Sequence, residues 1–243
     1  MKNKKRLDLR LSELYPQFTR TQLQSLIMQG KVYVNDQPIT KAGMLVSEDL
    51  PLELRYEEPK YVCRAGLKLE RALESFHIDV TGLTVLDAGL STGGFTDCLI
   101  QKGAHKVYGI DVGYGQVHEK IRQHERVVVM EKTNLRYLTD IGEKVDLITL
   151  DLSFISVLKV MDAVKALLKP AGKLIVLIKP QFEAERHQVG RGGIIKDPAI
   201  HEEVVQKVIK GIETAGFMYQ GTMESPITGT MGNKEFLAYF LRK

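Results

Sequence analysis

A glycine-rich segment between two acidic residues, DAGLSTGGFTD from Asp87 to Asp97, has the composition of a ligand-binding turn. It follows an apolar run and opens a helical pattern, so glycines and free helix N–H groups would meet a ligand there. The spacing does not match the G-x-G-x-x-G of dinucleotide sites. With Asp111 ending the next predicted strand, where a carboxylate binds ribose hydroxyls, the pattern favours an adenosyl ligand without phosphates, S-adenosylmethionine (SAM). A tight turn without a ligand is the alternative.

Two residues of opposite charge end two other apolar runs. Asp151 closes VDLITLD and Lys179 closes KLIVLIK. The carboxyl ends of parallel strands border the ligand crevice of an open sheet, so both side chains are expected on the same rim as the glycine-rich turn. A lysine beside a carboxylate in a desolvated site is suited to proton transfer. A solvated strand edge is the simpler interpretation of each residue alone, and Lys68 and Glu235 are further candidates of common surface types.

Strand and helix patterns alternate after residue 59, and this alternation must position the residues above. Apolar runs predict strands, and periodic apolar residues predict helices between them. Two late strands close together suggest a terminal hairpin. The chain therefore predicts an α/β fold with a doubly wound parallel sheet covered on both faces. The predicted strands are 83–89, 106–111, 127–130, 145–151, 173–179, one near 217 and 235–241, and the helices are 67–76, one ending at 122, 155–168 and 200–215.

The first 58 residues have a different order of predicted helices and strands. Helical patterns cover 7–14 and the segment from Thr19, a plausible N-cap, to Gly30. Strand patterns follow at 31–35 and 52–54, and Glu57-Glu58-Pro59 has the composition of a linker. The sequence therefore predicts a small α+β domain at 1–58 and a larger domain at 59–243.

Basic residues are concentrated at the front of the chain. Residues 1–41 contain eight Lys and Arg against three Asp and Glu, whereas the net charge of the whole chain is +4. Such a front end suits contact with a polyanion, and a solvated basic surface is the equally simple alternative. Arg20 starts the second predicted helix and Lys31 follows its end, so both can meet one phosphate backbone. The candidate contacts are Arg6, Arg10, Arg20 and Lys31.

Composition excludes several classes of protein. With 243 residues, 44% hydrophobic and 26% charged, the chain can bury a core and is not disordered. No apolar run reaches the ~18–20 residues of a membrane helix, and the N-terminus lacks the pattern of a signal peptide. The two cysteines lack disulfide or zinc-site patterning. A cytoplasmic protein without a structural metal is expected, and its oligomeric state stays open.

The motifs together resemble a known family. DAGLSTGGFTD, EKTNLR, DLSFIS, LIKPQFE and GNKEF are similar to the TlyA family, haemolysin-A-type ribosomal RNA methyltransferases with an FtsJ-like catalytic domain of Rossmann-like fold. The leader, from RLDLRLSE to GKVYVND, resembles the small RNA-binding fold of ribosomal protein S-four. The resemblance covers essentially the whole chain. It departs from the family at Cys63-Arg64-Ala65-Gly66, commonly Ser-Arg-Gly-Gly, and at Leu90, often Ala.

The resemblance implies a function and a set of site residues. The function is methylation of ribose 2′-hydroxyls in ribosomal RNA or ribosomal subunits, with SAM as cofactor. Lys179 would be the base or oxyanion stabiliser, and Asp151 would position it. The implied catalytic tetrad is Lys68, Asp151, Lys179 and Glu235. The implied SAM site is Asp87, Gly89, Ser91, Thr92, Gly93, Gly94, Phe95 and Asp111, with Asn134 near the adenine.

Other functions remain as alternatives. The family's name suggests a membrane-active haemolysin, but the sequence has no secretion signal, apolar span or strongly amphipathic membrane helix. A ribosome-binding protein without catalysis is a third possibility, against which all four tetrad residues argue. The basic, glycine-rich segment from Arg186 to Asp197 is either a mobile loop or a lid over RNA. No residue encodes which nucleotide is modified.

Overall fold

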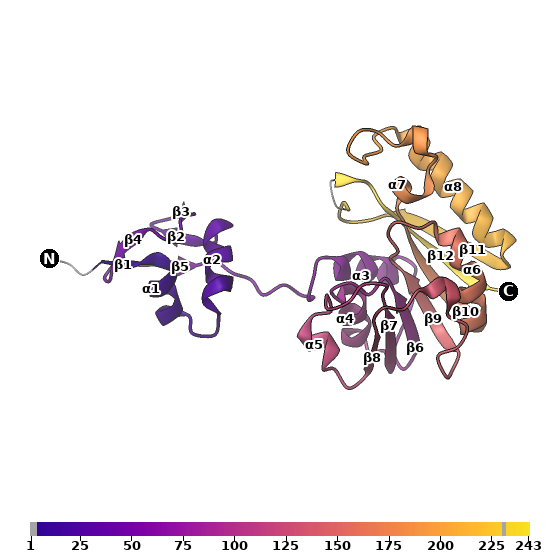
Figure 1. Cartoon of the computed structure of the whole chain (residues 1–243), viewed down its shortest axis with the longest axis horizontal. Coiled ribbons are helices and arrows are strands. Elements are labelled where there is room, and N and C mark those ends of the chain that lie inside the picture. Colours follow the sequence, from indigo (N-terminus) through magenta and orange to yellow (C-terminus); the bar gives the residue numbers. More distant parts are fainter. Residues whose placement is uncertain (1–3, 230–231) are drawn as a thin grey trace. The chain divides into compact units, whose positions relative to one another are not determined.

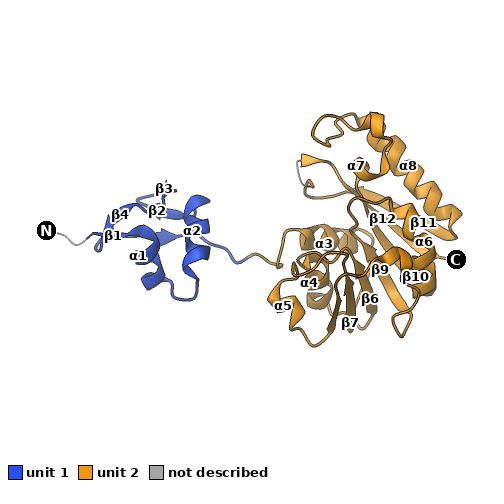
Figure 2. Cartoon of the chain, in the orientation of Figure 1, with its two compact units in different colours: residues 1–58 blue, residues 59–243 orange. Residues whose placement is uncertain are grey.

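The computed structural model describes residues 4–229 and 232–243. The chain forms two compact units, Met1–Glu58 and Pro59–Lys243 (Figure 2). They are called here the N-terminal unit and the C-terminal unit.

The N-terminal unit packs two helices on small sheets. Thr19 begins α2 with a capping box, because its hydroxyl accepts from the Gln22 amide while the Gln22 side chain accepts from the Thr19 amide. One face of each helix is buried in a core that includes Leu7, Leu23 and Val32. Three short strands were absent from the sequence prediction. The elements are β1 (Lys4–Arg6), α1 (Leu7–Leu14), α2 (Arg20–Met28), β2 (Val32–Val34), β3 (Gln37–Ile39), β4 (Leu45–Ser47) and β5 (Glu53–Leu54).

A seven-stranded sheet in the order β11-β12-β10-β9-β6-β7-β8 forms the centre of the C-terminal unit (Figure 1). Five strands from β10 to β8 are parallel, whereas β12 is antiparallel to both β10 and β11. The predicted parallel sheet and terminal hairpin are thus confirmed. The strands are β6 (Thr84–Ala88), β7 (Lys106–Ile110), β8 (Val127–Met130), β9 (Val145–Leu150), β10 (Leu168–Ile178), β11 (Phe217–Glu224) and β12 (Phe236–Arg242).

Helices cover both faces of this sheet, which confirms the doubly wound α/β fold. Alternate residues along each strand enter two different cores: Leu86 and Ile148 pack with α6 and α8, while Val85 and Leu147 pack with α3 and α4. Figure 1 shows these helix pairs on opposite sides of the sheet. The helices are α3 (Ala65–Ser75), α4 (Gly94–Gln101), α5 (Glu119–Arg122), α6 (Met161–Leu167), α7 (Pro180–Glu183) and α8 (Pro198–Thr214), with the 3-10 turns η1 (Leu135–Tyr137), η2 (Val157–Val160) and η3 (Arg186–Gln188).

The segment predicted as a helix at 155–168 is only partly helical. Phe154 has a left-handed backbone with φ of 65°, and the Ser156 side chain caps η2, so the α-helix α6 begins only at Met161. Strand β10 already starts at Leu168. The result is a loop, residues 151–156, between β9 and η2, and this loop carries Asp151 to the rim of the sheet.

Candidate active site

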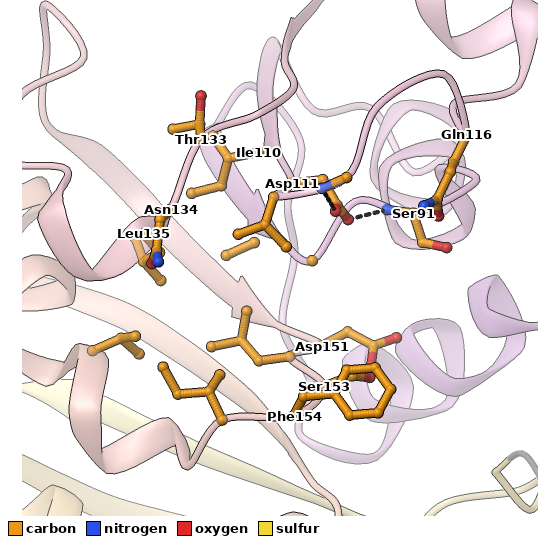
Figure 3. Close-up of a pocket in the computed structure, with 17 residues that line it drawn as sticks. Ser91, Ile110, Asp111, Gln116, Thr133, Asn134, Leu135, Asp151, Ser153 and Phe154 are labelled. Carbon is orange, nitrogen blue, oxygen red and sulfur yellow. Dashed lines mark hydrogen bonds between the residues drawn. The ribbon is translucent and has the colours of Figure 1, made fainter.

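A cavity of about 560 Å³ opens at the carboxyl ends of β6, β7 and β9 (Figure 3). This volume is within the usual range for small-molecule sites. Among the described residues that line it there are two aspartates, Asp111 and Asp151, and no lysine or arginine. This lining offers no side-chain cation to pair with a phosphate, so it suits a phosphate-free adenosyl ligand. The predicted residues Gly89, Ser91, Asp111, Asn134 and Asp151 all line it.

Asp111 connects the glycine-rich turn to the end of β7. One carboxylate oxygen accepts from the Ser91 amide at 2.8 Å and the other from the Gly113 amide at 2.7 Å (Figure 3). These two bonds fix the carboxylate at the wall of the cavity, and each oxygen keeps a lone pair for a ribose hydroxyl. Asn134 caps η1 through its oxygen, which accepts from the Arg136 amide at 3.0 Å. Its NH₂ group is thereby left for a ligand.

A smaller cavity of about 70 Å³ shares Gly89, Ser91 and Asp151 with the larger one. Thr92, Gly94 and Phe95 line only this smaller space, together with Cys63. Gly89 is required where the two strand ends meet, because a Cβ atom there would lie 2.3 Å from the Asp151 carbonyl oxygen. Gly93 lines neither cavity; with φ of 98° it forms the left-handed N-cap of α4.

Asp87 lies beneath the cavities instead of lining them. It is 1% exposed, and its oxygens accept from the hydroxyls of Thr96 at 2.7 Å and Thr149 at 2.9 Å. Burial raises the pKa of Asp87 to about 6, and the negative charge of Asp151 adds to the rise. In this structure Asp87 joins the end of β6 to α4 and β9 through these two hydroxyls and is not among the residues that line either cavity.

Lys179 and Asp151 meet at the rim of the sheet. Lys179 Nζ lies 2.6 Å from Asp151 Oδ1, and it donates a hydrogen bond to Ser153 Oγ at 2.9 Å. Both side chains of the ion pair are largely buried. Asp151 lines the two cavities, so the pair stands at the boundary between the cofactor cavity and the rim.

Lys68 and Glu235 form a second and more deeply buried pair. Their side chains are 8% and 3% exposed, and Lys68 Nζ lies 2.5 Å from Glu235 Oε2. Lys68 comes from α3, and Glu235 immediately precedes β12. Because Ile178 of β10 pairs with Phe236 of β12, continuing this antiparallel register places Lys179 opposite Glu235. The fold thus brings the four predicted catalytic residues to one end of the sheet.

The sequence analysis did not predict several residues that lie at this site. Ser153 contacts Lys179, and Gln116 and Thr133 line the cavity. Phe154 also lines it, is 91% exposed, and contacts the Phe182 ring in a tilted arrangement with ring centroids 5.1 Å apart. DLSFIS contains Ser153 and Phe154, so a strand-end motif was the available indication. Gln116 and Thr133 lie in loops without a recognisable pattern.

The candidate RNA-contact residues lie in the N-terminal unit and differ in their partners. Arg6 and Arg20 both pair with the buried carboxylate of Asp8, and both remain about half exposed. Arg10 is tied down, because it donates to the Glu48 carbonyl oxygen at 2.7 Å and pairs with Glu13. Lys31 is exposed. Arg6, Arg20 and Lys31 are therefore the better placed of the four for a phosphate.

The comparisons with known proteins agree with this geometry. Residues 61–242 match the FtsJ-like methyltransferase family, and residues 5–50 match the S4 domain. The chain is 41% identical over 224 residues to 16S/23S rRNA (cytidine-2'-O)-methyltransferase TlyA of Mycobacterium tuberculosis, covering 91% of this chain and 84% of the relative. The chain belongs to the TlyA family of FtsJ-like methyltransferases. It is therefore a SAM-dependent enzyme. The cavity, whose described lining residues include no lysine or arginine, fits that cofactor.

Two further relatives have names from a different activity. Hemolysin A of Brachyspira hyodysenteriae is 40% identical over 229 residues, covering 92% of this chain and 94% of the relative. A solved structure of a candidate hemolysin from Streptococcus thermophilus has a TM-score of 0.77 and 38% identity, and covers 100% of this chain and 90% of the other. Within the described residues, no helix is long and apolar enough to span a membrane.

Proposed function

We propose that this protein transfers a methyl group from SAM to the ribose 2′-hydroxyl of a nucleotide in ribosomal RNA. The observation that carries the proposal is the pair of buried lysine–carboxylate contacts, Lys179–Asp151 and Lys68–Glu235, at the end of the sheet where the cofactor cavity opens. Three relatives are named as rRNA (cytidine-2'-O)-methyltransferases, which supports the same reaction.

The proposed roles follow from the positions of these side chains. When bound, SAM supplies an electrophilic methyl group. Lys179 accepts the proton of the 2′-hydroxyl or stabilises its developing negative charge, while Asp151 and Ser153 hold the lysine in place. Lys68 and Glu235 orient the ribose. Holding the oxygen in line with the methyl group is the larger part of the work, because proximity removes most of the entropic barrier.

The N-terminal unit is proposed to hold the RNA. Arg6, Arg20 and Lys31 are cations with exposed surface, and phosphate contacts by such residues position an enzyme without selecting bases. In this proposal the domain boundary separates two tasks: residues 1–58 bind RNA, and residues 59–243 bind SAM and perform the transfer.

Nucleoside mass spectrometry of rRNA from matched knockout and parent cells tests the proposed function. The expected result is one or more 2′-O-methylated nucleosides that are present in the parent and absent from the knockout. Complementation with the parent gene restores them, and complementation with a Lys179→Ala gene does not. Identical rRNA methylation in all four samples would contradict the proposal.

A further inference from the structure

Asn233 is a buried polar residue outside the predicted catalytic and cofactor sets, and its side chain joins two loops. It is 4% exposed. Its Oδ1 accepts from the Ile195 amide at 3.1 Å, and its Nδ2 donates to the Gly193 carbonyl oxygen at 2.9 Å. Both ends of the amide are thus used on the backbone of the loop that links η3 to α8. A carboxylate or an aliphatic side chain could not make both bonds.

The same loop is anchored a second time at Ile195. This side chain is 4% exposed, and its carbonyl oxygen accepts from Nε2 of the buried His201 at 3.1 Å. The loop tip is closed by a hydrogen bond from the Gly190 amide to the Ile194 carbonyl oxygen at 3.1 Å. The segment from Gly190 to Ile195 is therefore a closed loop attached to the rest of the unit through Asn233 and His201.

The loop and the η3 turn before it, together residues 186–197, present three cations. Arg186, Arg191 and Lys196 are exposed, and within the described residues none of the three forms an ion pair. Arg6 and Arg20 of the N-terminal unit, in contrast, share one carboxylate. Three unpaired cations on a loop beside the start of β12 (Figure 1) suit the phosphates of a bound RNA.

On its other side, Asn233 belongs to the turn that covers Glu235. The Asn233 carbonyl oxygen accepts from the Gly229 amide at 2.8 Å, and the Ser225 amide donates to the Glu235 carbonyl oxygen at 2.8 Å. Gly229 packs directly on the Glu235 side chain, since a Cβ atom at this position would lie 2.1 Å from Glu235 Oε1. The turn that holds Asn233 therefore also confines the carboxylate that pairs with Lys68.

We propose that Asn233 is a positioning residue that couples the basic loop 186–197 to Glu235, so that phosphate contacts on the loop and the orientation of the target ribose are set together. The proposal rests on the proposed rRNA ribose methylation. It makes loop 186–197 an RNA-contact surface of the C-terminal unit, in addition to the cations of the N-terminal unit.

A double-mutant cycle between Asn233 and Arg191 tests the coupling. Methyl transfer from tritiated SAM to ribosomal subunits is measured for the parent, Asn233→Ala, Arg191→Ala and the double variant. Loss of two buried hydrogen bonds predicts a drop in kcat/KM of roughly tenfold for Asn233→Ala, and Arg191→Ala raises KM severalfold. If the arginine acts through a loop that Asn233 holds, the double variant is no worse than Asn233→Ala alone. Asn233→Asp, which keeps the bond from Ile195 but sets a buried carboxylate oxygen against the Gly193 carbonyl oxygen, is expected to be at least as impaired as Asn233→Ala.

Two further measurements separate the possible failures. SAM affinity by calorimetry stays within about twofold of the parent in every variant, which shows that the C-terminal unit is folded. Trypsin cleavage after Arg191 becomes faster in Asn233→Ala, which reports release of the loop without any need for activity. Multiplicative losses in the double variant, or an Asn233→Ala enzyme with parental kinetics, would overturn the coupling. A parent protein that does not methylate ribosomal subunits would instead refute the proposed function.

Discussion

Asp8 in the N-terminal unit and Asp87 in the C-terminal unit are both buried aspartates. Their surroundings shift the pKa values of the two carboxyl groups in opposite directions. Asp8 is contacted by Arg6, Gln24 and Arg20, whose hydrogen bonds and charges hold its pKa well below the usual range despite burial. Asp87 accepts hydrogen bonds from the hydroxyls of Thr96 and Thr149 and has no cation among the groups that shift it, and burial raises its pKa to about 6.

The two units also differ in how far their ion-paired cations are exposed. In the N-terminal unit one buried carboxylate holds two half-exposed arginines at the surface, where they can meet phosphates. In the C-terminal unit two lysines near the cavity are buried with their carboxylates, as in the Lys68–Glu235 pair, and the described residues that line the cavity include two aspartates and no lysine or arginine. The first arrangement suits docking of a polyanion, and the second suits chemistry on a cationic cofactor and a ribose.

Loss of the proposed base should have the largest effect. Lys179→Ala is expected to lower methyl transfer by about 10²–10⁴-fold, the usual contribution of a positioned acid or base. SAM affinity and RNA affinity should change little, because the residue lies at the end of β10 and outside the core. Tritium transfer to ribosomal subunits gives the rate. Lys173→Ala, near the middle of the same strand and six residues before Lys179, serves as the control and should retain parental activity.

The two aspartates should respond differently to neutralisation. Asp8→Asn is expected to destabilise the N-terminal unit by about 1–3 kcal/mol at pH 7, because it leaves two arginines without their carboxylate. Asp87→Asn should cost less than about 1 kcal/mol, since both threonine hydroxyls can still pair with an amide. Hydrogen exchange, followed on peptides from each unit, measures both free energies. Equal destabilisation by the two changes would show that the surroundings of Asp8 and Asp87 do not differ in their effect on stability.

The same exchange measurement should show that Asp8 and Asp87 make the free energy of unfolding of their units depend on pH with opposite signs. Because the pKa of Asp8 is lowered, its contribution to stability is present above about pH 4 and is lost as the pH falls below that value. Because the pKa of Asp87 is raised to about 6, its contribution is present below about pH 4 and is lost as the pH rises through 6. The parent and the matching Asn variant should therefore converge at low pH for Asp8.

Reversing charge in the N-terminal unit should affect RNA and not SAM. Arg20→Glu combined with Lys31→Glu is expected to weaken RNA binding by roughly tenfold and to flatten its salt dependence, since fewer counterions are released. Titrations at several salt concentrations give affinity and slope. Lys144→Glu with Lys243→Glu changes net charge equally and should leave the slope nearer to that of the parent. Matching slopes for both double variants would show that the N-terminal unit is not the docking surface.

The smallest predicted effect comes from a single methyl group. Gly229→Ala places a carbon against the Glu235 carboxylate, so it should lower kcat severalfold by moving Glu235 away from Lys68, while SAM affinity is unchanged. Gly221→Ala is the matched control, because its nearest neighbour is a Phe76 ring atom 3.3 Å away. Parental kcat in Gly229→Ala would show that the position of Glu235 does not limit the reaction.

The sequence predicted the sheet of the C-terminal unit well, because β6, β7, β9 and residues 174–178 of β10 are largely apolar runs buried on both faces. It failed where strands are three residues long and mostly exposed, as in β1 and β3, since so short a segment has no measurable period. It also failed at 155–168, where the left-handed Phe154 and the cap at Ser156 interrupt a helical pattern.

The site was predicted unevenly for a related reason. Asp151 and Lys179 end apolar strands, so topology alone brought them to one rim. Lys68 and Glu235 lie 167 residues apart, and no local pattern joins them, so only the family resemblance paired them. The place of Asp87 at the cofactor stays a prediction, whereas its bonds to Thr149 of β9 and Thr96 of α4 are contacts of which the sequence contains no indication.

Mass spectrometry of nucleosides from ribosomal subunits, after incubation with SAM and purified protein, tests most directly whether the protein methylates ribose and whether the transfer depends on Lys179. Parent protein should produce a 2′-O-methylated nucleoside, identified by a methyl group that stays on the ribose fragment, and Lys179→Ala should produce none above background. A methyl group found on the base, or equal ribose methylation by parent and variant, would contradict the assignment.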